Sequence, residues 1–145
     1  MATRWLLRLS DVNEKALRLT KVPQAALQLE AAWADELHVL VERSEMDQEV
    51  KVSRPDIRRS PDDPNRYAVR LRVRYVDPDF RITVAARGVF SLDPTQEEPQ
   101  RLLQYNAPAI LYGLIRGWVM LMTGGASVRR VELPAVNLAE RIERG

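Results

Sequence analysis

Residues 106–125 read NAPAILYGLIRGWVMLMTGG and decide how the rest of the chain is arranged. The stretch has the start and stop signals of one helix. Asn106 can cap the first turn, and Pro108 sits where a missing N–H group does no harm. Gly124 and Gly125 can adopt the left-handed conformation that ends many helices. The sequence therefore predicts a single long helix.

This predicted helix is apolar around most of its circumference, with Arg116 as the only charge between residues 107 and 122. Two adjacent apolar stripes comprise Ile110, Leu114, Trp118 and Leu121, and Leu111, Ile115, Val119 and Met122. A helix on a monomer surface normally has a polar back. About 16 apolar residues, interrupted by an arginine, are too short to favour a membrane span. We therefore expect burial on two sides, with a second subunit on one of them; the alternative is a helix enclosed by its own chain.

The predicted subunit interface uses six residues of the two stripes. Its residues are Leu111, Leu114, Ile115, Trp118, Val119 and Met122.

Length and composition indicate one soluble domain spanning residues 1–145. The chain is 46% apolar and 29% charged, with a net charge of +2. It has no cysteine, which excludes disulfides, thiolate nucleophiles and cysteine metal sites. The first residues lack the apolar core of a secretory signal, so we expect a cytoplasmic protein.

The clearest strands lie just before the helix. Residues 67–75 and 80–92 each alternate between apolar and polar side chains, and Asp77-Pro78-Asp79 provides a tight turn between them. Period-two alternation over about ten residues is typical of half-buried strands. The sequence predicts an antiparallel hairpin here.

The other segments are predicted with less detail. In the N-terminal segment, residues 1–34, the first part fits a helix or a strand, and residues 23–34 are predicted to be helical because they are rich in helix formers. Residues 37–41 and 50–57 are predicted strands, the second at an edge or bent, because Pro55 lacks an N–H donor. After the long helix we expect an extended segment and a short helix over residues 134–143. Strands followed by helices indicate an α+β fold, an antiparallel sheet with helices on one face.

Taken together, residues 67–142 resemble the protein-export chaperone SecB and its SecB-like relatives. Tyr67-Ala-Val-Arg-Leu-Arg-Val is similar to the family's third strand, and Gly88-Val-Phe-Ser-Leu to the motif that ends its fourth. The long helix and its arginine have the family spacing, and Val136-Asn137-Leu138 is similar to the Val-Asn-Phe that opens the last helix. The resemblance implies a four-stranded antiparallel sheet packed against a long helix and a short C-terminal helix.

The resemblance also implies a function. Members of the family are ATP-independent chaperones that assemble as dimers of dimers and hold unfolded polypeptides in apolar grooves. We therefore expect unfolded protein clients and a homotetramer, with a link to protein export. The export chaperone is acidic whereas this chain is weakly basic, so docking to the translocation motor is left open. The alternatives are a dedicated binder of one protein, such as an antitoxin, and a nucleic-acid-binding module.

The groove implied by the family would be lined from two parts of the chain. Its candidate residues are Trp33, Leu37, Val131, Leu133, Val136 and Leu138. The alternative role for each of these residues is ordinary core packing.

A row of arginines on the hairpin is the remaining candidate site. Its members are Arg70, Arg72, Arg74, Arg81 and Arg87. Such a stripe can bind nucleic acid or an acidic protein, or form a solvated face balanced by acids from neighbouring strands. Because no aromatic residues interleave the arginines to stack on bases, nucleic acid is disfavoured. His38, the single histidine, has no cysteine or carboxylate at ligand spacing, so we expect no metal site. The sequence contains no phosphate-loop motif and no catalytic constellation, so we also expect no cofactor and no enzymatic activity.

Overall fold

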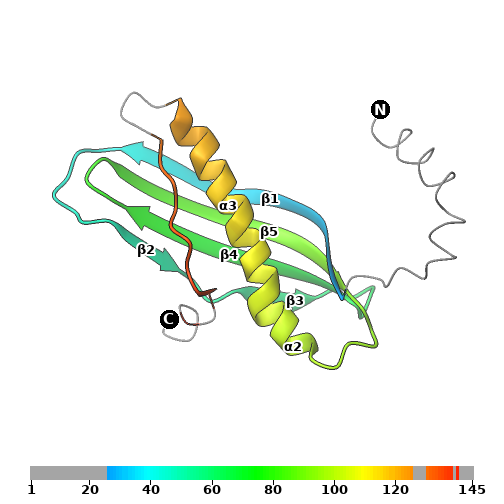
Figure 1. Cartoon of the computed structure of the whole chain (residues 1–145). Coiled ribbons are helices and arrows are strands. Elements are labelled where there is room, and N and C mark those ends of the chain that lie inside the picture. The colour runs from blue at the N-terminus through cyan, green and yellow to red at the C-terminus, as the bar shows by residue number, and fades with distance from the viewer. Residues whose placement is uncertain (1–25, 126–129, 139, 141–145) are drawn as a thin grey trace, which may run out of the picture.

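The computed structural model describes residues 26–125, 130–138 and 140. Expectations for residues 1–25, 126–129 and 141–143 lie outside the described residues. The rest forms one antiparallel sheet with a long helix across one face, which confirms the α+β class (Figure 1).

The sheet has four strand positions, and one edge position is shared by two short strands, β2 (Glu49–Val52) and β3 (Asp56–Arg59). The other strands are β1 (Leu27–Val41), β4 (Arg66–Val76) and β5 (Phe80–Leu92). Their order is β1-β5-β4-β2, and β3 also pairs with β4. The edge strand predicted for residues 50–57 is thus split in two around Pro55, as expected for a residue without an N–H donor.

The predicted hairpin is confirmed as β4 and β5. Its inward side chains form the centre of the core, and Val69, Leu71 and Phe90 are fully buried. At the turn, the Asp77 carboxylate accepts hydrogen bonds from the backbone N–H groups of Asp79 and Phe80, at 2.8 and 2.7 Å. Side-chain bonding of this kind fixes tight turns.

The helix predicted over residues 23–34 is wrong where the structure describes it. β1 begins at Leu27 and pairs with β5 along its full length. Helix propensity amounts to a few tenths of a kcal/mol per residue, so tertiary pairing overrides it. Register shifts at Glu30 and Asp35 interrupt the alternation of its side chains, so the first part of the strand lacks the period-two pattern of sequence.

The long helix begins earlier than predicted and contains a π-helical turn. It comprises α2 (Pro99–Arg101), the π-helical turn η1 (Leu102–Asn106) and α3 (Ala107–Gly124). Asn106 is itself helical and makes no side-chain cap. The π-helical turn lies where the ring of Pro108 would meet the carbonyl of the preceding turn, so it lets the helix pass the proline.

The end of the helix also differs in detail from the prediction. Gly125 is the C-cap, but its φ of −90° is not left-handed. Among the described residues, the stretch Pro99–Gly124 has the length and composition to cross a membrane. By length and composition alone the helix is thus not too short for a membrane span, contrary to the expectation from the sequence. Its packing is nevertheless that of a core helix, because Leu111, Ile115 and Val119 are fully buried.

The last described segment runs back beside α3 on the same face of the sheet (Figure 1). Thr123 Oγ1 accepts the Val131 N–H at 2.7 Å, and Arg116 Nε donates to the Leu133 carbonyl at 3.0 Å. The short helix predicted from residue 134 is not helical before Leu138. Asn137 Oδ1 accepts the N–H of Glu140 at 3.3 Å, which is an N-cap bond and explains the later start.

Candidate functional site

An apolar pocket lies between the edge strand β1 and the C-terminal end of α3. It has a volume of about 270 Å³ and is lined by Ala34, Leu37, Trp118, Leu121 and Met122. All five side chains are apolar, so the pocket offers contact area without selecting a particular charge or hydrogen-bond pattern.

The pocket exists because α3 crosses the sheet diagonally (Figure 1). The helix covers β4 and β5, whereas the second half of β1 extends past it. Leu37, Val39 and Val41 point to the helix side of the sheet, since they pair with the buried Val84, Ile82 and Phe80. Leu37 is nevertheless 47% exposed and Val41 51% exposed. The strand predicted at residues 37–41 is therefore present, but its apolar face is open rather than half-buried.

The structure separates the two β1 residues of the predicted groove. Trp33 pairs with Arg87, and Leu37 pairs with Val84, so the two side chains lie on opposite faces of the sheet. The register shift at Asp35 changes the alternation between them. Leu37 lines the apolar pocket and Trp33 does not.

The C-terminal groove candidates belong mainly to the core. Val131 is fully buried, Leu133 is 2% exposed and Leu138 is 7% exposed, whereas Val136 is partly buried against them. Their packing matches the alternative considered from the sequence. The apolar pocket is lined instead by Leu121 and Met122 of α3. Both belong to the apolar stripes of the helix, and this pattern of sequence could have identified them.

The two stripes of α3 have different environments. Leu111, Ile115 and Val119 pack against the protomer's own sheet, so the core accounts for three of the predicted interface residues. Leu114, Trp118 and Met122 are partly exposed and stay a prediction for the interface.

The stripe that faces away from the sheet also includes two residues that the interface prediction omitted. Leu121 is 79% exposed and Ile110 39% exposed.

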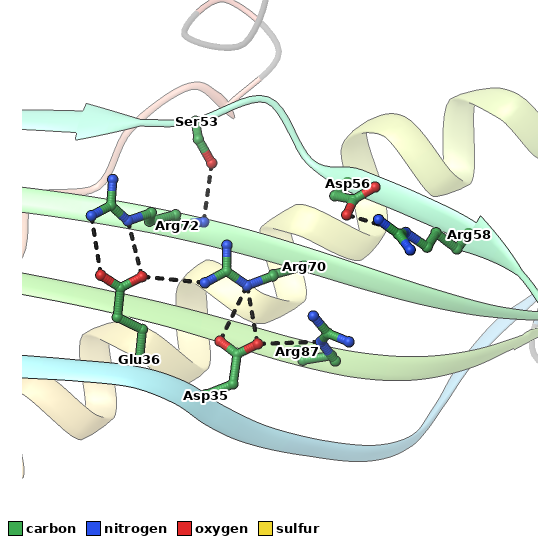
Figure 2. Close-up of polar contacts among 8 residues, drawn as sticks. All are labelled: Asp35, Glu36, Ser53, Asp56, Arg58, Arg70, Arg72 and Arg87. Carbon is green, nitrogen blue, oxygen red and sulfur yellow. Dashed lines mark hydrogen bonds and ion pairs between the residues drawn. The ribbon is translucent and has the colours of Figure 1, made fainter.

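The opposite face of the sheet holds a network of arginines and acids (Figure 2). Arg70 and Arg87 are directly opposite each other on β4 and β5, a like-charge arrangement that destabilises a sheet. The register shift at Asp35 directs two consecutive acids, Asp35 and Glu36, to this face. Asp35 lies 3.0 Å from Arg70 Nε and 3.3 Å from Arg87 Nε.

Glu36 completes the network by bridging two arginines. Its carboxylate accepts hydrogen bonds from Arg72 Nε and Nη2, both at 3.1 Å, and from Arg70 Nη2 at 3.2 Å. The Arg72 hydrogen bonds lower the pKa of Glu36, and the hydrogen bond to Asp35 raises the pKa of Arg70. This part of the arginine stripe is thus balanced by acids from a neighbouring strand, the alternative that the sequence favoured over nucleic acid.

The described residues contain no group of three or more histidines, aspartates and glutamates that could hold a metal ion. His38 is exposed on the edge strand β1, on the same face as Thr83.

Comparisons with known proteins give the fold a context. No protein-family model matches the chain, and no curated protein matches its sequence. Among solved structures, the chain is similar to the Mycobacterium tuberculosis SecB-like chaperone Rv1957, in complex with a ChAD peptide from the antitoxin HigA1. The TM-score is 0.60 and the identity 16%, over 82% of this chain and 94% of that one.

A second similar structure is a Streptococcus agalactiae protein of unknown function. It has a TM-score of 0.53 and 14% identity, over 78% of this chain and all of that one. The chain therefore has a SecB-like fold.

Proposed function

We propose that this protein is an ATP-independent chaperone of SecB-like type that holds non-native polypeptides at the apolar pocket between β1 and α3. The observation that carries the proposal is an open apolar surface next to the edge of a sheet. Leu37, Val39 and Val41 are all exposed on the helix side of β1, and the pocket adjoins them. Contiguous exposed apolar surface of this kind is typical of sites that bind another molecule.

The geometry suits an extended chain. Among the described residues, β1 pairs with β5 alone, so its other edge can form backbone hydrogen bonds with a bound segment. Alternate side chains of that segment would then enter the apolar pocket. Backbone pairing and apolar contact do not depend on a particular sequence, which suits a protein that binds many clients.

The test compares two leucines of the same strand. Leu37→Asp changes a residue that is 47% exposed and lines the pocket, whereas Leu40→Asp changes one that is 52% exposed on the opposite face. Covering the exposed half of a leucine is worth about 1 kcal/mol, roughly fivefold in Kd. We expect Leu37→Asp to weaken binding to several chemically unfolded proteins by at least about fivefold, and Leu40→Asp by less than about twofold. Equal effects of the two variants would contradict the proposed site.

A dedicated binder of one partner is the second candidate. It is favoured by the antitoxin peptide bound to the similar M. tuberculosis chaperone. A dedicated binder would ignore most unfolded proteins in the same assay yet bind its partner with the same dependence on Leu37. Nucleic-acid binding is less well supported, because Asp35 and Glu36 interrupt the arginine stripe.

Assembly into a homo-oligomer, a dimer of dimers, forms part of the proposal. Its support is the exposed stripe of α3, where Ile110 and Leu121 are uncovered in the protomer. We expect Ile110→Glu to lower the mass measured by sedimentation, whereas Leu37→Asp should leave it unchanged. A cytoplasmic location, a link to protein export and the lack of enzymatic activity complete the proposal.

A further inference from the structure

On the face of the sheet opposite α3, a second cluster of cations differs from the network around Asp35 and Glu36. It lies next to this network, toward the turn between β4 and β5, around a hollow of about 350 Å³. Among the described residues that line the hollow, three are cations, Lys51, Arg74 and Arg81, and one is an acid, Glu49. We call this hollow, with its three cations, the basic hollow.

The strands bring these charges together without a bridging acid between them. Lys51 on β2 is directly opposite Arg74 on β4, and Arg81 on β5 is a diagonal neighbour of Arg74. Like charges directly across a sheet destabilise it. At the equivalent Arg70–Arg87 pair, Asp35 reaches both arginines and offsets the repulsion. Within residues 26–125, 130–138 and 140, the Arg74 side chain makes no hydrogen bond or ion pair, although its backbone pairs within the sheet.

The acids near the hollow are too distant to satisfy its cations. Glu49 lies 3.8 Å from Lys51 Nζ, and Glu42 lies 3.8 Å from Arg81 Nε, at the outer limit of an ion pair. The Lys51 side chain is 69% exposed and that of Arg81 57% exposed. Exposed ion pairs at this separation contribute little to stability. The N–H donors of the three cations are thus available to an anion from outside.

We propose that the basic hollow binds an acidic polypeptide segment through its carboxylates. Arg74 would supply the central contact, with Lys51 and Arg81 on either side. Met46, which is 41% exposed and lines the same hollow, can contact the apolar stem of a glutamate. Nucleic acid fits less well, because the aromatic residue of the lining, Tyr75, is 2% exposed and donates its hydroxyl to Asp77, so it cannot stack on a base.

This surface lies on the opposite side of the sheet from the apolar pocket, so the inference does not rest on the proposed chaperone function. A protein with both surfaces can hold an apolar client on one face and contact an acidic partner on the other. Leu37→Asp should leave binding at the basic hollow unchanged, which lets either proposal fail alone.

The test measures fluorescence anisotropy of a labelled peptide of alternating glutamate and serine with the full chain. We expect Arg74→Glu to weaken binding by about tenfold, and binding to decrease as salt rises. Arg101→Glu is the matched control, because it makes the same change of charge at an exposed residue of α2 on the other face. It should change the affinity by less than about twofold. Arg74→Gln, a milder change, should give an intermediate loss.

Three results would overturn the inference. The first is absence of peptide binding by the unaltered protein. The second is an equal loss in Arg74→Glu and Arg101→Glu, which would indicate a nonspecific effect of net charge. The third is Arg74-dependent binding of a short single-stranded oligonucleotide without binding of the peptide, which would assign the hollow to nucleic acid.

Discussion

The contact between α3 and the sheet at Gly88 allows a prediction that can be worked out in detail. Gly88 lies on the inward face of β5, beneath the helix. A Cβ atom at this position would be 2.8 Å from Phe90 Cε2, 2.9 Å from Leu111 Cδ2 and 3.2 Å from Leu29 Cδ1. Carbon atoms pack best at about 3.5–4.0 Å. Gly88→Ala therefore forces the surrounding side chains apart by roughly half an ångström or more.

The magnitude follows from how little room these neighbours have. Phe90 and Leu111 are both fully buried, so neither can move into solvent. Overpacking of a core costs about 1–3 kcal/mol, and replacing glycine returns about 0.4–1 kcal/mol through the unfolded state. We expect a net loss of about 1–2 kcal/mol, or roughly 2–8 °C in Tm for a protein of about this size.

Thermal and urea denaturation followed by circular dichroism measure this change. Gly125→Ala is the control, since nothing lies within 4 Å of an added Cβ there and its φ of −90° suits any residue. The control should be neutral or slightly stabilising. A Gly88→Ala variant as stable as the control would show that the helix does not approach the sheet at Gly88 as described.

Two further predictions concern the polar contacts. Thr123→Val keeps the side-chain shape but removes the acceptor for the buried Val131 N–H. We expect the free energy of unfolding, measured by urea denaturation, to fall by about 1–3 kcal/mol. An unchanged free energy of unfolding would show that this hydrogen bond does not stabilise the fold. Because the Arg72 hydrogen bonds lower the pKa of Glu36, its contribution to stability is present above the ordinary glutamate pKa of about 4.3 and is lost as the pH falls through the lower, folded-state value. Glu36→Gln should thus have a shallower decrease of Tm below about pH 4 than the unaltered protein, and parallel curves would contradict the assignment.

Local sequence patterns determined several elements of this protein. The alternation in β4 and β5 specified both strands and their inward faces, because side-chain direction in a strand has a strict period of two. The two apolar stripes of the long helix indicated more apolar surface than the sheet covers, and Ile110 and Leu121 are indeed exposed; burial against a second subunit stays a prediction. These features depend on neighbours in the sequence, which is why they could be predicted.

The tertiary structure decided what depends on distant neighbours. Residues 27–34 belong to a strand because β5 supplies their hydrogen-bond partners, although their composition favours a helix. The register shift at Asp35 places two consecutive acids on one face and puts Trp33 and Leu37 on opposite faces. Strand register and the diagonal path of α3 also determine that Leu37 is open while Leu133 is buried. Such outcomes arise from pairing and packing between segments far apart in the chain, and the residues themselves carry no local signal for them.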